Sequence, residues 1–350
     1  MTKATKCFIA AFSVSVSALP LYAQNALEQF EELKTGTEAA VPPPALPAAA
    51  LDEPALSPEE AMKKLPLFDY SGTDVVSVTR SVAEVHKGYS VEKIELLISD
   101  PLRQLGEFKR EFIYYRTTRP GPRPTTLIFP PFVPQKIDDW SAAHFTKKGF
   151  NAIIIAPSES LTDTTRPLDK VDDMLIRGVI VARMCVDLLE TFPEVDKEKI
   201  YAYGISMGGI RTSISFGVEK RIKKAVEIVG GGDLPGIIAD TRFKKLKGLR
   251  DARMQAEGLA TVEDFRAYMK KTMTVDPMDF AGLRNPEDIF MVLGNGDRLV
   301  PDAYQKKLYS AFSRPKEGRY PLAKRSILGH YPTAVKFMRY IDLFVDFTGN

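Results

Sequence analysis

The sequence predicts an α/β fold whose central sheet is mostly parallel. Apolar runs typical of strands alternate with helix-like runs after residue 90, which is the order that parallel β-α-β units produce. At one of these strand-to-helix boundaries a serine stands between two glycines, in Gly204-Ile205-Ser206-Met207-Gly208. The chain has 350 residues and is 44% hydrophobic, so it can bury a large core, and one α/β domain is expected rather than two.

Short runs rich in β-branched and aromatic residues predict about eight strands. They cover residues 94–99, 108–116, 125–129, 152–155, 200–205, 224–229, 288–293 and 323–328. Helices are expected between the strands at 137–148, 170–189, 208–218 and 334–347, with another beginning near Ala303. The segment from about 234 to 283 is longer than a connection between two strands requires, and its helical, charged character predicts an inserted lid.

The first 23 residues predict a secretory signal peptide of bacterial type. Two lysines precede a short apolar run at 7–19, and Ala23 is the small residue that signal peptidase prefers before its cleavage site. We therefore expect a secreted or periplasmic protein without a stable membrane span after cleavage, because the apolar run is short for a bilayer. Residues 24–65 include a stretch rich in proline and alanine and are expected to form a disordered linker. The folded domain is expected over 66–350.

Ser206 has the surroundings of a nucleophile that is held on a sharp turn. Residues 200–205 form an apolar strand and Gly208 opens a helix of small residues, so the serine stands at a strand-to-helix turn. The backbone of such a turn is strained, and its neighbours must lack bulky side chains, which Gly204 and Gly208 do. The alternative is a serine that only caps a helix. The flanking strand and helix favour the nucleophile.

A serine hydroxyl is protonated at neutral pH, so it needs a base, and the base needs an orienting anion. The chain has three histidines, and His330 lies where a predicted strand runs into a loop and a C-terminal helix. Asp297 leaves the end of the strand at 288–293 in a glycine-rich turn. The chain order is therefore serine, acid, histidine. Because the carboxyl ends of parallel strands meet at one sheet edge, we expect the three side chains to lie together.

Other residues compete for these roles. Asp302 precedes a predicted helix and is more readily explained as its N-terminal cap. Asp233 ends an earlier strand, at a second position where an acid is found in such folds. His86 lies in a polar segment and His144 in a predicted helix, and both are expected to be solvated or structural. For His330 the alternative is an ordinary loop histidine.

These motifs together resemble those of the α/β-hydrolase superfamily, over about residues 90–347. The resemblance rests on the glycine-flanked Ser206, the Gly-x-Gly-Asp-x-x-Val-Pro segment around Asp297 and the Gly-His pair that ends at His330. Asp276-Pro277-Met278 resembles a further common feature of the fold. The resemblance implies a serine hydrolase or acyltransferase that works through an acyl-enzyme, but it does not imply a substrate.

An acyl-transfer enzyme also needs two backbone N–H groups aimed at the oxyanion. Met207, the residue after the nucleophile, is expected to supply the first. The second should follow the strand at 125–129, where many relatives have a His-Gly pair and this chain has two prolines and then Phe132. Proline has no N–H, so Phe132 is expected to be the donor, with Val133 as the alternative.

The composition narrows the classes of partner and cofactor that we expect for this chain. Lys and Arg number 48 against 45 Asp and Glu, a net charge of +3 that does not suggest a nucleic-acid partner. No Cys/His pattern has metal-ligand spacing and no Gly-x-Gly-x-x-Gly follows a strand, so neither a metal nor a dinucleotide cofactor is expected. Signal cleavage would leave Cys185 as the only cysteine, so no disulfide within the chain is expected.

A small-molecule acyl ester is the expected substrate, cleaved by Ser206 with His330 as general acid and base and Asp297 orienting the imidazole. A serine peptidase of the same fold is one alternative. A non-catalytic envelope or secretion-associated binding protein is the other. A basic stretch in the predicted lid is either a solvated helix face or a means of attracting an anionic substrate. It consists of Lys244, Lys245, Lys247, Arg250 and Arg253.

Overall fold

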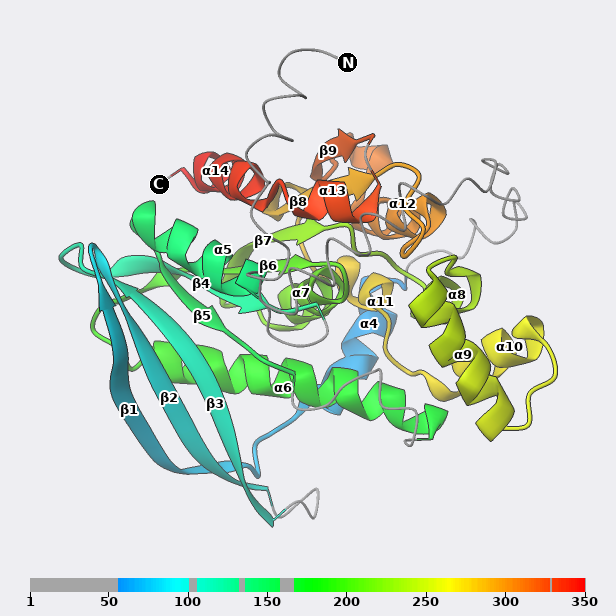
Figure 1. The fold of residues 1–350 in the computed structure, drawn as a ribbon, viewed down its shortest axis with the longest axis horizontal. Helices are drawn as coiled ribbons and strands as arrows, with labels where there is room; N and C mark the ends of the chain where they lie inside the picture. The colour runs from blue at the N-terminus through cyan, green and yellow to red at the C-terminus, as the bar shows by residue number, and fades with distance from the viewer. Residues whose placement is uncertain (1–55, 101–105, 132–135, 158–166, 328, 350) are drawn as a thin grey trace, which may run out of the picture. The chain divides into compact units, whose positions relative to one another are not determined.

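A nine-stranded sheet organises the structure (Figure 1). The computed structural model describes residues 56–100, 106–131, 136–157, 167–327 and 329–349. In this part of the chain the strand order is β1-β2-β3-β5-β4-β6-β7-β8-β9. The bounds are β1 Asp74–His86, β2 Tyr89–Asp100, β3 Gly106–Thr117, β4 Arg123–Phe129, β5 Asn151–Ile154, β6 Val195–Ile205, β7 Ile222–Ile228, β8 Ile289–Gly294 and β9 Leu322–Ser326.

The sheet has a parallel part and an antiparallel part. From β5 through β4 and β6 to β9, every neighbouring pair is parallel, so the carboxyl ends of these strands meet at one edge. β1, β2 and β3 pair antiparallel and extend the sheet beyond β5. All eight predicted strands are present. The expected α/β class with a mostly parallel sheet is confirmed.

β1 is the strand that the sequence does not predict. All 13 of its residues are exposed. A strand is recognised in a sequence by the alternation that a buried face imposes, and β1 has no such face. Its place is set instead by its hydrogen-bonded register with β2 and by the ion pair between Arg80 and Glu92.

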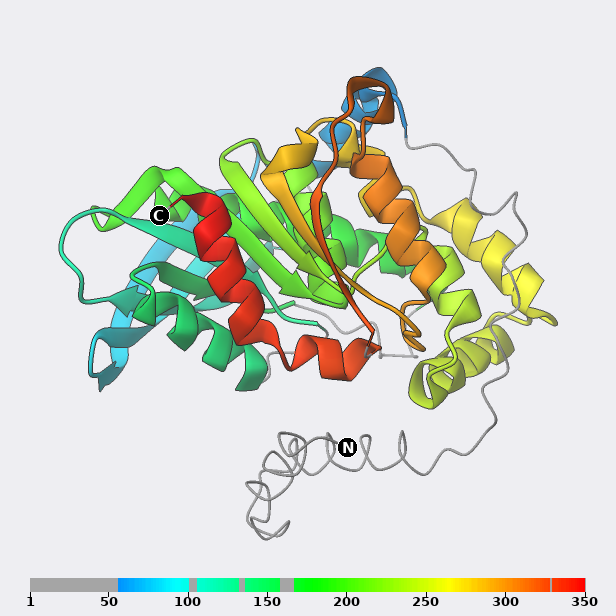
Figure 2. The same ribbon diagram turned by 90° about the horizontal axis from the view of Figure 1, so that it is seen from above.

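Helices cover both faces of the sheet (Figure 2). Tyr201 and Tyr203 of β6 pack against α5 and α14, and the intervening residue faces the other layer because side chains alternate along a strand. The first face carries α5 (Lys136–Lys147) and α14 (Phe337–Thr348), and the second carries α6 (Val171–Leu189), α7 (Met207–Val218) and α12 (Asp302–Phe312). The helix predicted at 334–347 begins instead as a separate short helix, α13 (His330–Ala334), before α14.

Aromatic rings fill the layer between β6 and the helices of the first face, α5 and α14. Phe145 of α5 meets Tyr203 edge-on with ring centroids 5.5 Å apart, and Phe344 of α14 meets Tyr201 at 5.7 Å. Such pairs contribute about 0.5–1.5 kcal/mol beyond the burial of their area. This packing holds the strand that leads directly into Ser206.

The folded unit begins earlier than the sequence predicts. Pro58–Lys64 forms α4, a helix with an N-terminal capping box. The Nζ atom of Lys64 lies 2.8 Å from Oδ2 of Asp279, which ties α4 to the rest of the unit. The linker predicted at 24–65 is therefore wrong at its C-terminal end. The remainder of that linker and the predicted signal at 1–23 lie outside the described residues.

A helical insertion separates β7 from β8 and coincides with the predicted lid. Its helices are α8 (Leu234–Asp240), α9 (Lys244–Ala256), α10 (Val262–Thr272) and α11 (Pro277–Ala281). In Figure 1, α8, α9 and α10 lie on the opposite side of the picture from β1, β2 and β3.

Asp276 joins the two ends of this insertion. Its carboxylate accepts N–H bonds from Asp233 (3.1 Å) and Leu234 (2.8 Å) at the entry and from Met278 (3.0 Å) at the exit. Burial raises the pKa of Asp276 to about 6, and the three N–H groups oppose that rise. One carboxylate thus fixes where the insertion leaves the sheet and where it returns.

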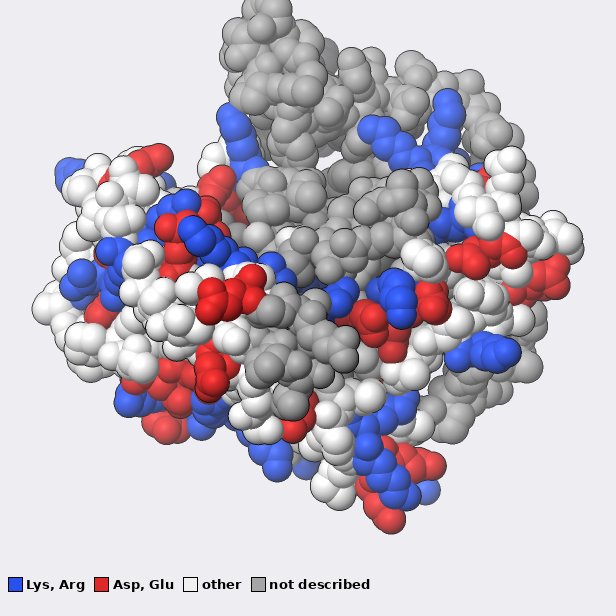
Figure 3. Space-filling model, turned by 90° about the horizontal axis from the view of Figure 1, so that it is seen from below, with Lys and Arg blue, Asp and Glu red and all other residues white. Residues whose placement is uncertain are grey.

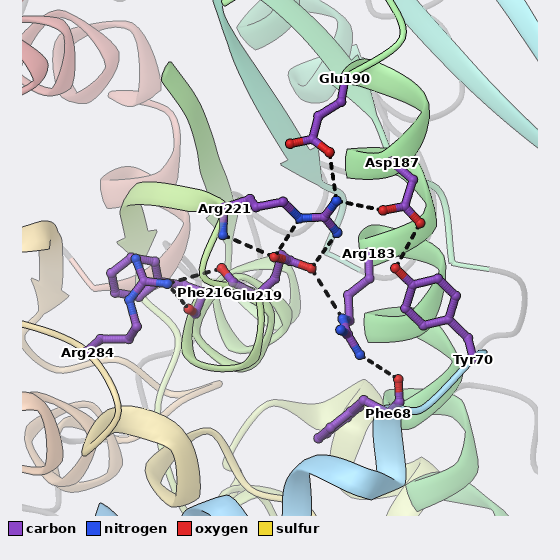
Figure 4. Close-up of polar contacts among 9 residues, drawn as sticks. All are labelled: Phe68, Tyr70, Arg183, Asp187, Glu190, Phe216, Glu219, Arg221 and Arg284. Carbon is purple, nitrogen blue, oxygen red and sulfur yellow. Dashed lines mark hydrogen bonds and ion pairs between the residues drawn. The ribbon is translucent and has the colours of Figure 1, made fainter. Parts of the chain in front are cut away.

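A cluster of ion pairs fixes the end of α7 that lies opposite Ser206 (Figure 4). Glu219, the C-cap residue of α7, is buried and accepts hydrogen bonds from Arg221 (2.8 and 2.9 Å) and from Arg183 of α6 (3.2 Å). Arg221 also reaches Asp187 at 2.6 Å and Glu190 at 2.9 Å. These contacts lock α7 against α6.

Arg284 binds carbonyls at the end of the same helix (Figure 4) and at the start of β7. Its guanidinium donates to the carbonyls of Phe216 (2.7 Å), Glu219 (3.1 Å) and Ile222 (2.5 Å). Burial lowers the pKa of Arg284 to about 10, still well above neutral pH. A half-buried cation at a helix C-terminus satisfies carbonyls that have no partner within the helix.

The surface and the interior add four general observations. On the face shown in Figure 3, basic and acidic side chains are interspersed. None of the helices in the described ranges has both the length and the apolar character needed to cross a bilayer. Among those same residues, no three or more His, Cys, Asp and Glu side chains are grouped so as to hold a metal ion. Cys185 of α6 is a buried free thiol whose pKa is raised by burial.

Candidate active site

Ser206 stands on a strained turn between β6 and α7. Its φ and ψ are 60° and −123°, a conformation that costs a non-glycine residue about 1–3 kcal/mol. A Cβ on Gly204 would overlap the Gly208 carbonyl, and a Cβ on Gly208 would overlap the carbonyl oxygen of Phe129 at the end of β4. The two glycines are therefore required for the turn to close and for α7 to begin directly against β4.

Strain is concentrated at this edge of the sheet. Within the described ranges, the non-glycine residues with positive φ are Ser206 (60°), Val229 (46°) and Asp233 (60°). Ser206 follows β6, and the other two follow β7. Such outliers persist only where the surrounding structure imposes them, and they cluster at functional sites.

Asp297 and His330 are in direct contact, as their places after β8 and β9 lead one to expect. Nδ1 of His330 lies 2.7 Å from Oδ2 of Asp297, and both residues are buried. The other carboxylate oxygen of Asp297 accepts the N–H groups of Leu299 (2.8 Å) and Val300 (3.0 Å). Nε2 of Gln305 donates to Oδ2 at 3.1 Å. The carboxylate is thus held rigidly and faces the imidazole.

The two competing acids have other partners. Oδ1 of Asp302 accepts the backbone N–H of Asp297 at 3.2 Å, so it supports the turn that carries Asp297. Asp302 is the first residue of α12 rather than its cap, which is Pro301. Oδ2 of Asp233 lies 2.6 Å from the buried Nζ of Lys307, and Oδ1 accepts an N–H within α8. Neither carboxylate is hydrogen-bonded to a histidine in the described structure.

The other two histidines pair with surface carboxylates. His86 at the end of β1 lies 2.8 Å from Glu84, and His144 of α5 lies 2.8 Å from Asp342 of α14. Both contacts lie on elements other than β6 and α7, which flank the turn at Ser206. The surroundings of His86 and His144 therefore fit a structural role rather than a catalytic one.

The region of the expected oxyanion hole is described on one side only. Met207 is the first residue of α7, and N–H groups in the first turn of a helix have no intrahelical acceptor. Phe132, the second predicted donor, and the alternative Val133 lie outside the described residues. The close approach of Gly208 to Phe129 brings the start of α7 against the end of β4, immediately before that loop.

Arg211 is a buried residue of this region that the sequence does not single out. It lies on α7, and its guanidinium donates to the carbonyls of Pro130 (3.5 Å) and Ile155 (3.3 Å), which follow β4 and β5. It also lies over the Phe129 ring, 5.3 Å from the centroid. Burial lowers the pKa of Arg211 to about 10. Arg211 thus connects the helix that begins at Ser206 to the ends of two neighbouring strands.

Glu227 is a second buried polar residue beside the turn. It points from β7 toward α7, and a Cβ on Gly209 would lie 3.0 Å from its Oε1. The same oxygen accepts the N–H of Gly230. Burial raises the pKa of Glu227 to about 8, so this carboxyl group is protonated at neutral pH. No local sequence pattern marks it, because its surroundings come from packing between β7 and α7.

A small cavity opens beside Ser206. Its volume is about 70 Å³, and it lies between the turn and helices α8, α9 and α10 of the insertion. Arg250 and Arg253 of the predicted basic stretch are buried and line this cavity, whereas the three lysines of that stretch are exposed. The basic stretch is therefore divided between the cavity wall and the solvent face of α9.

The fold is similar to that of several esterases of known structure. The acetyl xylan esterase 1 from Thermoanaerobacterium sp. JW/SL YS485 is 14% identical, with a TM-score of 0.60 over 86% of this chain and 99% of that one. The acetyl xylan esterase from Paenibacillus sp. R4 is 13% identical, with the same TM-score and the same coverage. A cold-adapted esterase from an Arctic intertidal metagenomic library is 13% identical, with a TM-score of 0.50 over 77% of this chain and 99% of that one. No family model and no curated protein matches the sequence. At such identities the similarity is one of fold.

Proposed function

We propose that this chain, which has the α/β-hydrolase fold, is a serine hydrolase that cleaves carboxylic esters. The observation that carries the proposal is the buried hydrogen bond between His330 and Asp297, at the sheet edge where Ser206 stands on its strained turn. A base that is oriented by a buried anion is what an activated serine requires. The solved structures of similar fold that are named esterases support an ester as the bond that is cleaved.

In this mechanism Oγ of Ser206 attacks the carbonyl carbon of the ester while His330 accepts the hydroxyl proton. The oxyanion that forms is held by the N–H of Met207 and, we propose, by that of Phe132. The bond between the carbonyl carbon and the alcohol oxygen then breaks, and His330 returns the proton to the alcohol. A water molecule, deprotonated by His330, then attacks the acyl carbon. The bond from that carbon to Oγ of Ser206 breaks, His330 returns the proton to Oγ, and the acid is released.

Arg211 and Glu227 act on this site through other residues. Arg211 binds the carbonyl of Pro130, directly before the loop that we expect to donate the second oxyanion N–H. The neutral side chain of Glu227 packs against Gly209 and so supports the first turn of α7. Both are positioning residues in this proposal.

The predicted signal at 1–23 leads us to propose that the enzyme is secreted or periplasmic. Mass spectrometry of protein purified from the periplasm or the medium of an expressing bacterium tests this. Cleavage after Ala23 is the expected result. Full-length protein that stays in the cytoplasm would overturn the proposal.

Labelling with a fluorophosphonate probe tests the enzymatic proposal, because the probe requires an activated serine and not merely a pocket. Wild type should be labelled and should hydrolyse p-nitrophenyl acetate. Ser206→Ala should lose the label and lose turnover by about a thousandfold or more while it remains folded. Ser213→Ala is the matched control, because Ser213 is a buried serine of the same helix.

A folded Ser206→Ala protein that keeps most of its activity would refute the role of this serine. Wild type that is neither labelled nor active would favour a binding protein. Cleavage of peptide substrates in preference to esters would favour a peptidase.

A further inference from the structure

We propose that the cavity beside Ser206 holds the acyl part of the ester and restricts it to short, apolar acyl groups of about four carbons. This inference rests on the proposed function, because it names the substrate class of the same site. It is carried by the lining of the cavity, by its position relative to His330 and by its volume.

The lining is almost entirely apolar. Two kinds of element supply it, the core of the domain and the helical insertion. The core contributes side chains such as Leu168 and Ile210, and the insertion contributes side chains such as Leu234, Ile237, Phe265 and Met269. Burial of each methylene against such a wall is favourable by about fourfold in an equilibrium constant. The wall therefore selects hydrocarbon.

The position of the cavity indicates the acyl side of the ester. The described residues that line it include Ser206 and Met207 but neither His330 nor Asp297. The leaving alcohol must lie near His330, because that imidazole gives it the proton. The acyl group stays bonded to Ser206 through the second half of the reaction. It therefore occupies the space that Ser206 and Met207 line and that His330 does not.

The volume sets the length. An apolar cavity of about 150 Å³ accepts benzene, which has six carbon atoms. The cavity here has about 70 Å³, roughly half of that, and so accommodates about three carbons beyond the carbonyl. Phe265 and Met269 of α10 are fully buried and form part of its wall. A butyryl group fits this space, and an octanoyl group does not.

The charged groups of the lining are the guanidinium groups of Arg250 and Arg253, and the surroundings of Arg250 argue against a carboxylate-bearing acyl group. Arg250 is buried at the wall, but its guanidinium donates to the Ala239 carbonyl and lies 2.8 Å from Asp251. Its charge is therefore already balanced by a neighbouring carboxylate. A second carboxylate would have to be buried in an apolar space, which is unfavourable.

The test is a series of p-nitrophenyl esters with acetyl, butyryl, hexanoyl, octanoyl and succinyl groups. Each kcat/KM is normalised to the rate of hydroxide hydrolysis of the same ester. We expect an increase of about fourfold per methylene from acetyl to butyryl and a fall of at least tenfold by octanoyl. We also expect butyryl to exceed succinyl by at least tenfold.

Two variants test the wall itself. Met269→Ala removes three side-chain heavy atoms from the wall of the cavity and enlarges it, so the preferred acyl group should lengthen from butyryl to hexanoyl. Met273→Ala is the matched control, because Met273 lies at the end of the same helix and does not line the cavity. Ile237→Phe fills the cavity and should reduce butyryl hydrolysis at least tenfold while acetyl hydrolysis changes less than threefold.

Each outcome has one meaning. A wild-type profile that is flat from acetyl to octanoyl, or that favours succinyl, overturns the inference. So does an unchanged profile in folded Met269→Ala, or an equal loss of acetyl and butyryl hydrolysis in Ile237→Phe. If both variants fail to fold, the wild-type profile still decides. Absence of hydrolysis of every ester refutes the proposed function instead.

Discussion

Replacement of Asp297 by asparagine removes the charge that faces His330 and leaves the shape of the side chain unchanged. The asparagine carbonyl oxygen can still accept the N–H groups of Leu299 and Val300, at 2.8 and 3.0 Å in the wild type. Its amide nitrogen then takes the place of Oδ2, 2.7 Å from Nδ1 of His330 and 3.1 Å from Nε2 of Gln305. A donor now faces Nδ1, so the imidazole must carry its proton on Nε2, the nitrogen that should receive the proton of the serine.

The expected effect of this wrong tautomer is a fall in kcat of about ten thousandfold, or about 5.5 kcal/mol in the activation barrier. The mismatch with Gln305 adds a destabilisation of about 1–3 kcal/mol at pH 7. Ester hydrolysis per mole of folded protein, measured at 25 °C and corrected by urea unfolding, separates the two effects.

Asp302→Asn and Asp233→Asn are the controls, since both change one carboxylate to an amide near the same sheet edge. Asp302→Asn should change kcat less than tenfold. Asp233→Asn leaves the buried Lys307 without its partner and should destabilise the fold by about 3–5 kcal/mol, with kcat of the folded fraction nearly unchanged. If Asp233→Asn loses most of its kcat while Asp297→Asn is nearly normal, the assignment of Asp297 as the orienting acid is refuted.

Three further predictions concern stability and charge. The pKa of Glu227 is raised from 4.5 to about 8, so both states bind the proton below about pH 4.5, and stability is lost as pH rises from there to about 8. Over this range, urea unfolding should therefore show that the free energy of unfolding of wild type falls relative to that of Glu227→Gln, by up to about 5 kcal/mol. Equal slopes of that free energy against pH in the two proteins would contradict this. Arg284→Met leaves three carbonyls without their donor and should lower the free energy of unfolding by about 3 kcal/mol with unchanged kcat, and a loss below 1 kcal/mol would contradict the role of the cation. Gln replacement of Lys244, Lys245 and Lys247, all exposed, should alter kcat/KM for a carboxylate-bearing ester and its neutral analogue equally; a selective loss that about 0.15 M salt reproduces would show steering.

The sequence predicted the parts of this molecule whose causes are local. The predicted resemblance to the α/β-hydrolase superfamily is confirmed at the level of fold. β4, β5 and β8 are buried apolar runs, and so is the end of β6 that leads into Ser206, whereas β9 is short and mostly exposed. Ser206 and Asp297 each follow a buried apolar run in a glycine-containing turn, and His330 follows β9 directly after Gly329. These signals need no knowledge of distant residues.

What the sequence could not predict depends on contacts between distant elements. Lys307, which pairs with Asp233, is 74 residues further along the chain, so no local pattern could decide between the candidate acids. Arg211 and Glu227 are ordinary residues of a helix and a strand until α7 packs against β4 and β7. α4 falls within a segment assigned to a linker by its composition, and Lys64 meets Asp279 only in the folded chain.

The shared anchor at Asp276 makes the insertion a unit whose two ends are held at one place. Its entry and exit are fixed to a single carboxylate, so the points where it leaves and rejoins the sheet stay together whatever helices lie between them. Those same helices supply most of the wall around the acyl cavity. In the function that we propose, substrate preference therefore depends on an insertion that is separate from the turns that carry Ser206, Asp297 and His330.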